Sequence, residues 1–205
     1  MLKKIFVLNI LLVACLMNVF GQPPSLWHLG VENGLSNNYI VDIIQDGQGF
    51  VWIATESGLN RFDGKGFTVY TKNNSAIVSN ELNTLLYDKT ENNIWIGSQR
   101  DGISIFDCAS HSFTDYTIEQ GLMTNDVTHL SHAEDGGIWI THYHVGVGHY
   151  NKKTKQLTPF PSSGIEGMKS QNWCSFDDGN GNLYVGHAFD GLSIIDVENR
   201  TARNI

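Results

Sequence analysis

The sequence predicts an all-β fold, a β-propeller of four consecutive four-stranded blades. One short pattern centred on an aromatic residue recurs four times, at spacings of 43, 44 and 45 residues between successive aromatics, which is the period of a propeller blade. The segments between the aromatics alternate apolar and polar residues and are separated by turns rich in Gly, Asn and Asp. The predicted blades span residues 35–77, 78–121, 122–166 and 167–205. The recurring aromatic anchors are Trp52, Trp95, Trp139 and Tyr184.

Each repeat predicts four strands in the same order. The first strand alternates apolar and polar residues, as in 39–44 and 82–87. The second carries the anchor in a consecutive apolar run, which fits a strand covered on both faces. A glycine opens the third strand, and a short outer strand, such as 67–70, ends the blade. The four strand-opening glycines are Gly58, Gly102, Gly146 and Gly191.

The N-terminus resembles an export signal. Residues 1–21 combine two lysines, an apolar stretch over 5–20 and a small residue at Gly21. The stretch is short for a membrane span, so we expect a signal peptide and a periplasmic or cell-envelope location. Lipoprotein processing at Cys15 is a less favoured alternative. Residues 25–34 form a possible closing outer strand that would complete the last blade of a ring.

Charge and cysteine content exclude several classes of function. The net charge is −8 and the basic residues form no run, which disfavours nucleic acid as a partner. The three cysteines show no CxxC spacing, so the sequence predicts no metal site and no cofactor.

Three segments of the first repeat, 34–38, 47–55 and 58–63, resemble the two-component regulator propeller repeat. The resemblance implies the N-terminal periplasmic sensor region of a Bacteroidetes-type hybrid two-component sensor histidine kinase, acting in signal transduction through a phosphorelay. Its implied partners are a small-molecule or oligosaccharide ligand, and the rest of a receptor chain or a dimer partner. The sequence contains no kinase motif, so we expect this chain to be no enzyme. Rings of this family ordinarily hold seven blades, which predicts that four blades are a fragment or the product of a truncated reading frame.

The loops that join second to third strands, and those between blades, converge at one end of a propeller channel, where ligands usually bind. Carboxylate, amide and aromatic groups there suit sugar recognition. Inter-blade asparagines, such as Asn38, Asn80 and Asn125, either join them or only cap turns. The candidate ligand-binding residues are Glu56, Arg100, Asp101, His142, Tyr143, His144, His187, Phe189, Asp190 and Trp173.

Two other functions remain open from the residues alone. A propeller lyase or hydrolase would place His142, Tyr143, His187 and Arg100 over the channel. A protein-interaction platform would instead use exposed loops and outer strand edges.

Overall fold

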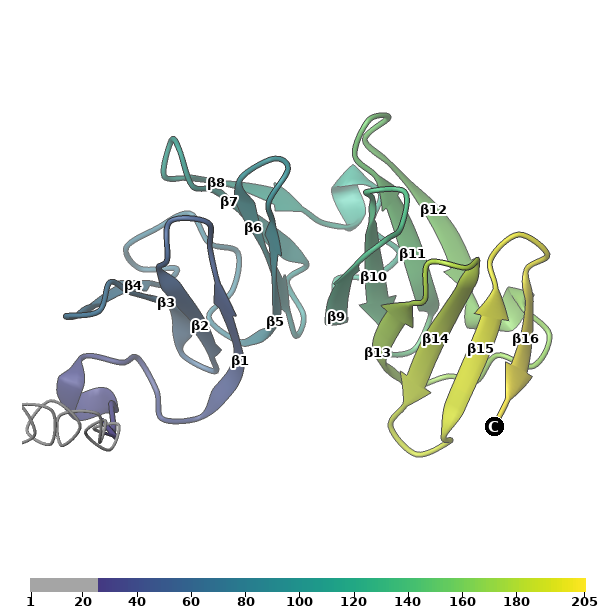
Figure 1. Ribbon diagram of the computed structural model, residues 1–205, viewed down its shortest axis with the longest axis horizontal. Helices are drawn as coiled ribbons and strands as arrows, with labels where there is room; N and C mark the ends of the chain where they lie inside the picture. The colour runs from purple at the N-terminus through teal and green to yellow at the C-terminus, as the bar shows by residue number, and fades with distance from the viewer. Residues whose placement is uncertain (1–25) are drawn as a thin grey trace, which may run out of the picture.

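The computed structural model describes residues 26–205 and contains four antiparallel sheets that follow one another along an arc (Figure 1). Each sheet holds four strands paired in chain order, so the predicted four four-stranded blades are confirmed. The predicted signal peptide lies outside the described residues. Within 26–205, no helix is long and apolar enough to cross a membrane.

The strands have the following bounds. Blade 1 contains β1 (Ile40–Gln45), β2 (Val51–Thr55), β3 (Gly58–Phe62) and β4 (Phe67–Tyr70). Blade 2 contains β5 (Leu82–Asp88), β6 (Asn93–Ser98), β7 (Ile103–Asp107) and β8 (Ser112–Tyr116). Blade 3 contains β9 (Val127–His132), β10 (Ile138–His142), β11 (Gly146–Asn151) and β12 (Gln156–Pro161). Blade 4 contains β13 (Asn172–Asp177), β14 (Asn182–His187), β15 (Leu192–Asp196) and β16 (Thr201–Asn204). Short 3-10 helices span Val31–Asn33, Ile118–Gln120 and Ser162–Gly164.

The hydrophobic core lies between the blades. Three clusters fill the three junctions, and each contains the tryptophan of one blade and aliphatic residues of the next. Trp52, Trp95 and Trp139 are therefore buried to 1%, 1% and 2% exposure. The fourth anchor, Tyr184, is only half-buried and lies 6.4 Å from the exposed Phe176 ring. Blade stacking, rather than the interior of any single sheet, thus keeps the anchors from water.

The first strand of every blade carries a β-bulge at the same place. The skipped residues are Val41, Asn83, Thr128 and Trp173. A bulge leaves backbone groups without a partner in their own ladder, and the neighbouring blade supplies the partner here.

Side chains at the bulges of blades 1, 2 and 3 bind the backbone of the next blade. The residue after the bulge accepts a hydrogen bond from a backbone N–H one blade later: Asp42 from Leu85 at 2.7 Å, Thr84 from Leu130 at 3.3 Å and His129 from Ser175 at 3.3 Å. Two bulged residues also donate to the next blade, Asn83 to the Val127 carbonyl and Thr128 to the Asn172 carbonyl. We call this set the inter-blade latch.

The segment predicted to form a closing outer strand has another conformation in its described part. Residues 26–30 form no strand and residues 31–33 form a 3-10 helix. Blade 4 already holds its own outer strand, β16, so this segment has no strand to pair with there. Closure of a longer ring by residues 25–34 stays a proposal.

The glycines that open the third strands occupy positive-φ positions. At Gly146, φ is +124° and an added Cβ would lie 2.3 Å from the carbonyl oxygen of Phe160. The backbone of β12 therefore approaches β11 more closely than any side chain allows.

Candidate functional site

A hollow of about 470 Å³ lies at the end of the propeller predicted to bind ligands. We call it the mouth. Three of the candidate ligand-binding residues line it, Glu56, Arg100 and Trp173, and they come from blades 1, 2 and 4. Its other lining residues are Tyr39, Val41, Glu81, Leu82, Asn83 and Gln99.

The mouth continues along the first strands into a second hollow of about 400 Å³, which we call the channel groove. The two share Tyr39, Val41, Asn83 and Trp173. Residues of all four blades line the groove, including the latch residues Asp42, Thr84 and His129. The shared residues include Val41, Asn83 and Trp173, so the bulges place side chains at the boundary of both hollows.

Aromatic rings gather beside the mouth. Trp173 is 60% exposed, and the ring of Tyr143 meets it edge-on at 6.2 Å. The ring of His144 lies 4.4 Å from that of Tyr143. Three of the candidate residues thus come together from two blades, and Trp173 offers a flat apolar surface to a ligand.

The polar groups of the mouth are charged and accessible. Glu56, Glu81 and Arg100 are all exposed. Arg100 and His144 also lie close enough to Asp126 to oppose the effect of burial, which raises the pKa of the Asp126 carboxyl. Carboxylates accept hydrogen bonds from hydroxyl groups, and a guanidinium beside them donates hydrogen bonds to hydroxyl groups.

Two candidate histidines lie in the interior instead. His142 is fully buried, its Nδ1 lies 3.1 Å from the Asp126 carbonyl, and burial lowers the pKa of its imidazole to about 4. His187 is 9% exposed, its Nε2 lies 2.7 Å from Ser193 Oγ, and burial lowers its pKa as well. Neither side chain lines the mouth or the channel groove, and the lowered pKa values favour the neutral imidazole at neutral pH.

The remaining candidates lie outside both hollows. Phe189, 82% exposed, and Asp190 belong to the β14–β15 loop of blade 4. Asp101 donates its backbone N–H to Ser98 in the β6–β7 turn. None of the three lines the mouth or the channel groove.

The inter-blade asparagines serve the backbone. Asn38, Asn80 and Asn125 each accept a hydrogen bond from a backbone N–H seven or eight residues earlier, at 2.9–3.0 Å. Asn172 is fully buried and donates to the His142 carbonyl. The turn-capping alternative therefore describes these side chains.

Sequence reasoning did not select Tyr39, Asn83 and Gln99, which also line the mouth, whereas the inter-blade residue Glu81 was an expected loop candidate. Tyr39 and Asn83 lie in or next to a first strand, where alternation alone predicts ordinary sheet residues. A bulge has no sequence signature of its own here, because Val, Asn, Thr and Trp all occupy it.

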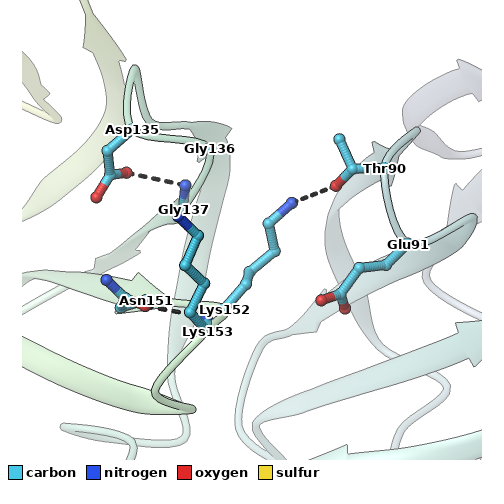
Figure 2. Close-up of a pocket in the computed structure, with 8 residues that line it drawn as sticks. All are labelled: Thr90, Glu91, Asp135, Gly136, Gly137, Asn151, Lys152 and Lys153. Carbon is cyan, nitrogen blue, oxygen red and sulfur yellow. Dashed lines mark hydrogen bonds between the residues drawn. The ribbon is translucent and has the colours of Figure 1, made fainter.

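A third hollow, also about 470 Å³, lies at the opposite end of the blades, among the β5–β6, β9–β10 and β11–β12 turns. Figure 2 shows Lys152 of blade 3 reaching across it to Thr90 of blade 2. The same ammonium pairs with Asp88 at 2.6 Å, so its charge is already neutralised. This lysine ties two blades together. No group of three or more His, Cys, Asp or Glu side chains that could hold a metal occurs in residues 26–205.

Comparison with known proteins agrees with the repeat pattern. Residues 34–57 match the family model described as "Two component regulator propeller". The chain superposes on the extracellular domain assigned to the hybrid two component system BT3049 of B. thetaiotaomicron with a TM-score of 0.81 and 36% identity over 87% of its length. Residues 34–57 thus carry a repeat of the two component regulator propeller type, and the chain is similar to an extracellular two component domain.

Two further proteins show partial likeness to the chain. A 41-residue stretch is 46% identical to Histidine kinase P4 of Formosa agariphila. Streptogramin B lyase shares the fold alone, with 15% identity, a TM-score of 0.62, and coverage of 81% of this chain and 54% of that chain. This propeller chain spans 26% of the BT3049 domain, and the stretch matching the kinase covers 20% of this chain and 3% of that protein.

Proposed function

We propose that this chain is an extracytoplasmic ligand-sensing part of a two-component sensor and that its mouth binds a carbohydrate or glycan-derived ligand. The observation that carries the proposal is the 36% identity to an extracellular two-component domain over 87% of the chain. In this proposal, the chain has no catalytic output of its own, and the phosphorelay depends on kinase segments of a receptor. Export by the N-terminal signal peptide would place the propeller in the periplasm or cell envelope.

The mouth supports a carbohydrate ligand by its chemistry. A sugar ring has an apolar face that packs on a flat aromatic surface, and Trp173 exposes such a surface with Tyr143 at its edge. Its hydroxyls need directional partners, which Glu56, Glu81 and Arg100 supply around the hollow. A volume of about 470 Å³ falls within the range of small-ligand sites.

Glycan-array screening followed by calorimetry tests this proposal. We expect a bound oligosaccharide whose affinity falls at least about tenfold in Trp173→Ala, because the aromatic surface that packs on the sugar ring and excludes water from it is lost. Arg100→Gln should weaken binding by a similar factor through the loss of a charged donor. Phe189→Ala serves as the matched control, since Phe189 is exposed on the same blade but lines neither hollow.

Each other outcome favours a named alternative. Release of product from the glycan would favour a propeller lyase or hydrolase. Absence of glycan binding, together with capture of a defined protein partner that Trp173→Ala leaves intact, would favour an interaction platform. Equal loss of affinity in Phe189→Ala and Trp173→Ala would refute the mouth as the binding site.

A further inference from the structure

A hollow of about 340 Å³ lies between blades 3 and 4, at the end opposite the mouth, and none of the candidate residues lines it. The ring of Trp139 meets His149 at 4.8 Å and Phe160 at 5.3 Å. Carboxylates of both blades surround these rings. The lining residues are Ala133, Glu134, Asp135, Trp139, His149, Thr158, Phe160, Asp177, Gly181 and Val197.

The internal repeat shows why this hollow exists. In blade 1, Arg61 pairs with Trp52 in the β2–β3 register, and His149 pairs with Trp139 at the same place in blade 3. The residue two before each tryptophan is Phe50 in blade 1 and glycine in blade 3. The residue six before is aspartate in blade 1 and alanine in blade 3. Three smaller side chains therefore leave space in blade 3 that blade 1 fills.

What fills this space in blade 1 is a cation. The Arg61 guanidinium carbon lies 4.6 Å from the centre of the Phe50 ring and 5.9 Å from that of Trp52. A guanidinium over aromatic faces is a favourable arrangement. In blade 1, the Arg61 side chain therefore occupies the space that corresponds to the hollow between blades 3 and 4.

Two carboxylates of the hollow, Asp135 and Glu134, have acceptor positions that no protein group in the described part of the chain uses. Asp177 already accepts three hydrogen bonds, from Trp139 Nε1 at 2.8 Å and from the backbone N–H groups of Glu134 and Gly179. Asp135 accepts the Gly137 N–H at 2.9 Å and lies 3.0 Å from His149 Nε2, both through Oδ1. Within residues 26–205, Asp135 Oδ2 and the Glu134 carboxylate accept no hydrogen bond from the protein.

The basic groups nearby do not occupy the free acceptor positions of Asp135 and Glu134. Burial raises the pKa of the Asp135 carboxyl, but the Gly137 N–H, His149 and the charge of Lys153 together hold it below its ordinary value. Arg200 lies 4.6 Å over the Phe160 ring and does not line the hollow. Gly137 is needed for the arrangement, since an added Cβ would lie 2.7 Å from His149 Nε2 and 2.9 Å from Asp135 Oδ1.

We propose that the hollow between blades 3 and 4 binds a small organic cation bearing a guanidinium group. The cation packs on the His149 side of the rings, at the place that Arg61 takes in blade 1, and donates hydrogen bonds to Asp135 and Glu134. A planar guanidinium matches a carboxylate with two parallel N–H bonds, and the exposed carboxylates of Asp135 and Glu134 are open to such a partner. The site lies at the opposite end from the mouth and does not depend on the proposed sugar ligand.

Titration of the full chain with methylguanidinium chloride at constant ionic strength tests the proposal, with urea as the neutral ligand of matching shape. The readout is the indole N–H signal of Trp139 in an NMR spectrum, assigned by its loss in Trp139→Phe. We expect a saturable shift with methylguanidinium and none with urea. An equal shift with urea would overturn the proposal.

Three variants locate the site. His149→Arg supplies the cation from the chain itself, as in blade 1, and should abolish the saturable shift. Asp135→Asn keeps an acceptor for the Gly137 N–H but removes the charge, and should weaken binding at least about tenfold. Glu119→Gln, an exposed change in the 3-10 helix after blade 2, should bind like the parent. Binding that persists unchanged in His149→Arg, with the fold intact by circular dichroism, would place the cation elsewhere and refute the assignment.

Discussion

Replacement of Lys152 by methionine tests how strongly one ion pair holds two blades together. The Lys152 ammonium lies 2.6 Å from Asp88 Oδ2 and 2.7 Å from Thr90 Oγ1, and the side chains of Lys152 and Asp88 are 13% and 2% exposed. Loss of one partner of a buried ion pair costs about 3–5 kcal/mol, because the other charge stays buried and unpaired. Asp88 keeps two hydrogen bonds from Thr90, so we expect the lower end of that range, about 3 kcal/mol.

Urea unfolding followed by tryptophan fluorescence measures this cost. With a slope of about 2–3 kcal/mol per molar urea, Lys152→Met should lower the unfolding midpoint by about 1 M. Lys153→Met is the matched control, since its exposed side chain should change stability by less than about 0.5 kcal/mol. The double variant Asp88→Asn/Lys152→Met should lose less stability than Lys152→Met, because no unpaired charge remains.

The pH dependence gives the same test a second readout. Burial raises the pKa of Asp88, but the hydrogen bonds from Lys152 and Thr90 outweigh it, so the folded pKa lies below the ordinary value of 3.8. The ionised carboxylate therefore stabilises the fold above that value, and this contribution is lost as pH falls through the folded pKa. In Lys152→Met the folded pKa should rise, so the difference from the parent should shrink in acid. A loss of stability that is independent of pH, or equal in Lys153→Met, would refute the ion pair as the cause.

Three further predictions concern single residues. Gly146→Ala should destabilise the fold by more than about 3 kcal/mol in urea unfolding, whereas Gly64→Ala, also at positive φ but with nothing within 4 Å of its Cβ, should cost about 1 kcal/mol. Because the pKa of His142 is lowered to about 4, its NMR titration should stay near that value and stability should rise between about pH 4 and 6.5, where the unfolded chain binds the extra proton; a transition near 6.5 in the folded protein would contradict its burial. The exposed Cys174 should react with a thiol reagent in the native state, while Cys108, with its pKa raised to about 11 by burial, should react only after unfolding; mass spectrometry of labelled peptides distinguishes the two.

The internal repeat made it possible to predict the fold from the sequence. Four copies of one apolar and turn pattern predict four copies of one sheet, and the tryptophans identify the strand that neighbouring blades bury. Tyr184 shows the limit of this reasoning, because its exposure depends on a neighbour and not on its own strand. Among the described residues, Tyr184 has no following blade to cover it, which is why it is half-buried.

The site was less predictable, for a physical reason. Loop position selected Glu56, Arg100 and Trp173, which line the mouth, but it also selected His142, whose side chain is buried. Whether a loop side chain faces water depends on contacts between blades, which lie more than forty residues apart in sequence. Tyr39 was missed because it adjoins a regular-looking strand.

The inter-blade latch has a consequence for how such chains change over time. In each pairing the side chain belongs to one blade and the receiving group is main chain of the next, with carboxylate, hydroxyl and imidazole all serving as acceptors. Every residue type except proline offers the same backbone N–H donor, so the next blade needs no matching side chain for this bond. The latch therefore sets no side-chain requirement on the blade that follows, so that blade can vary in sequence at the latched backbone, while the hydrophobic clusters at each junction still have to match.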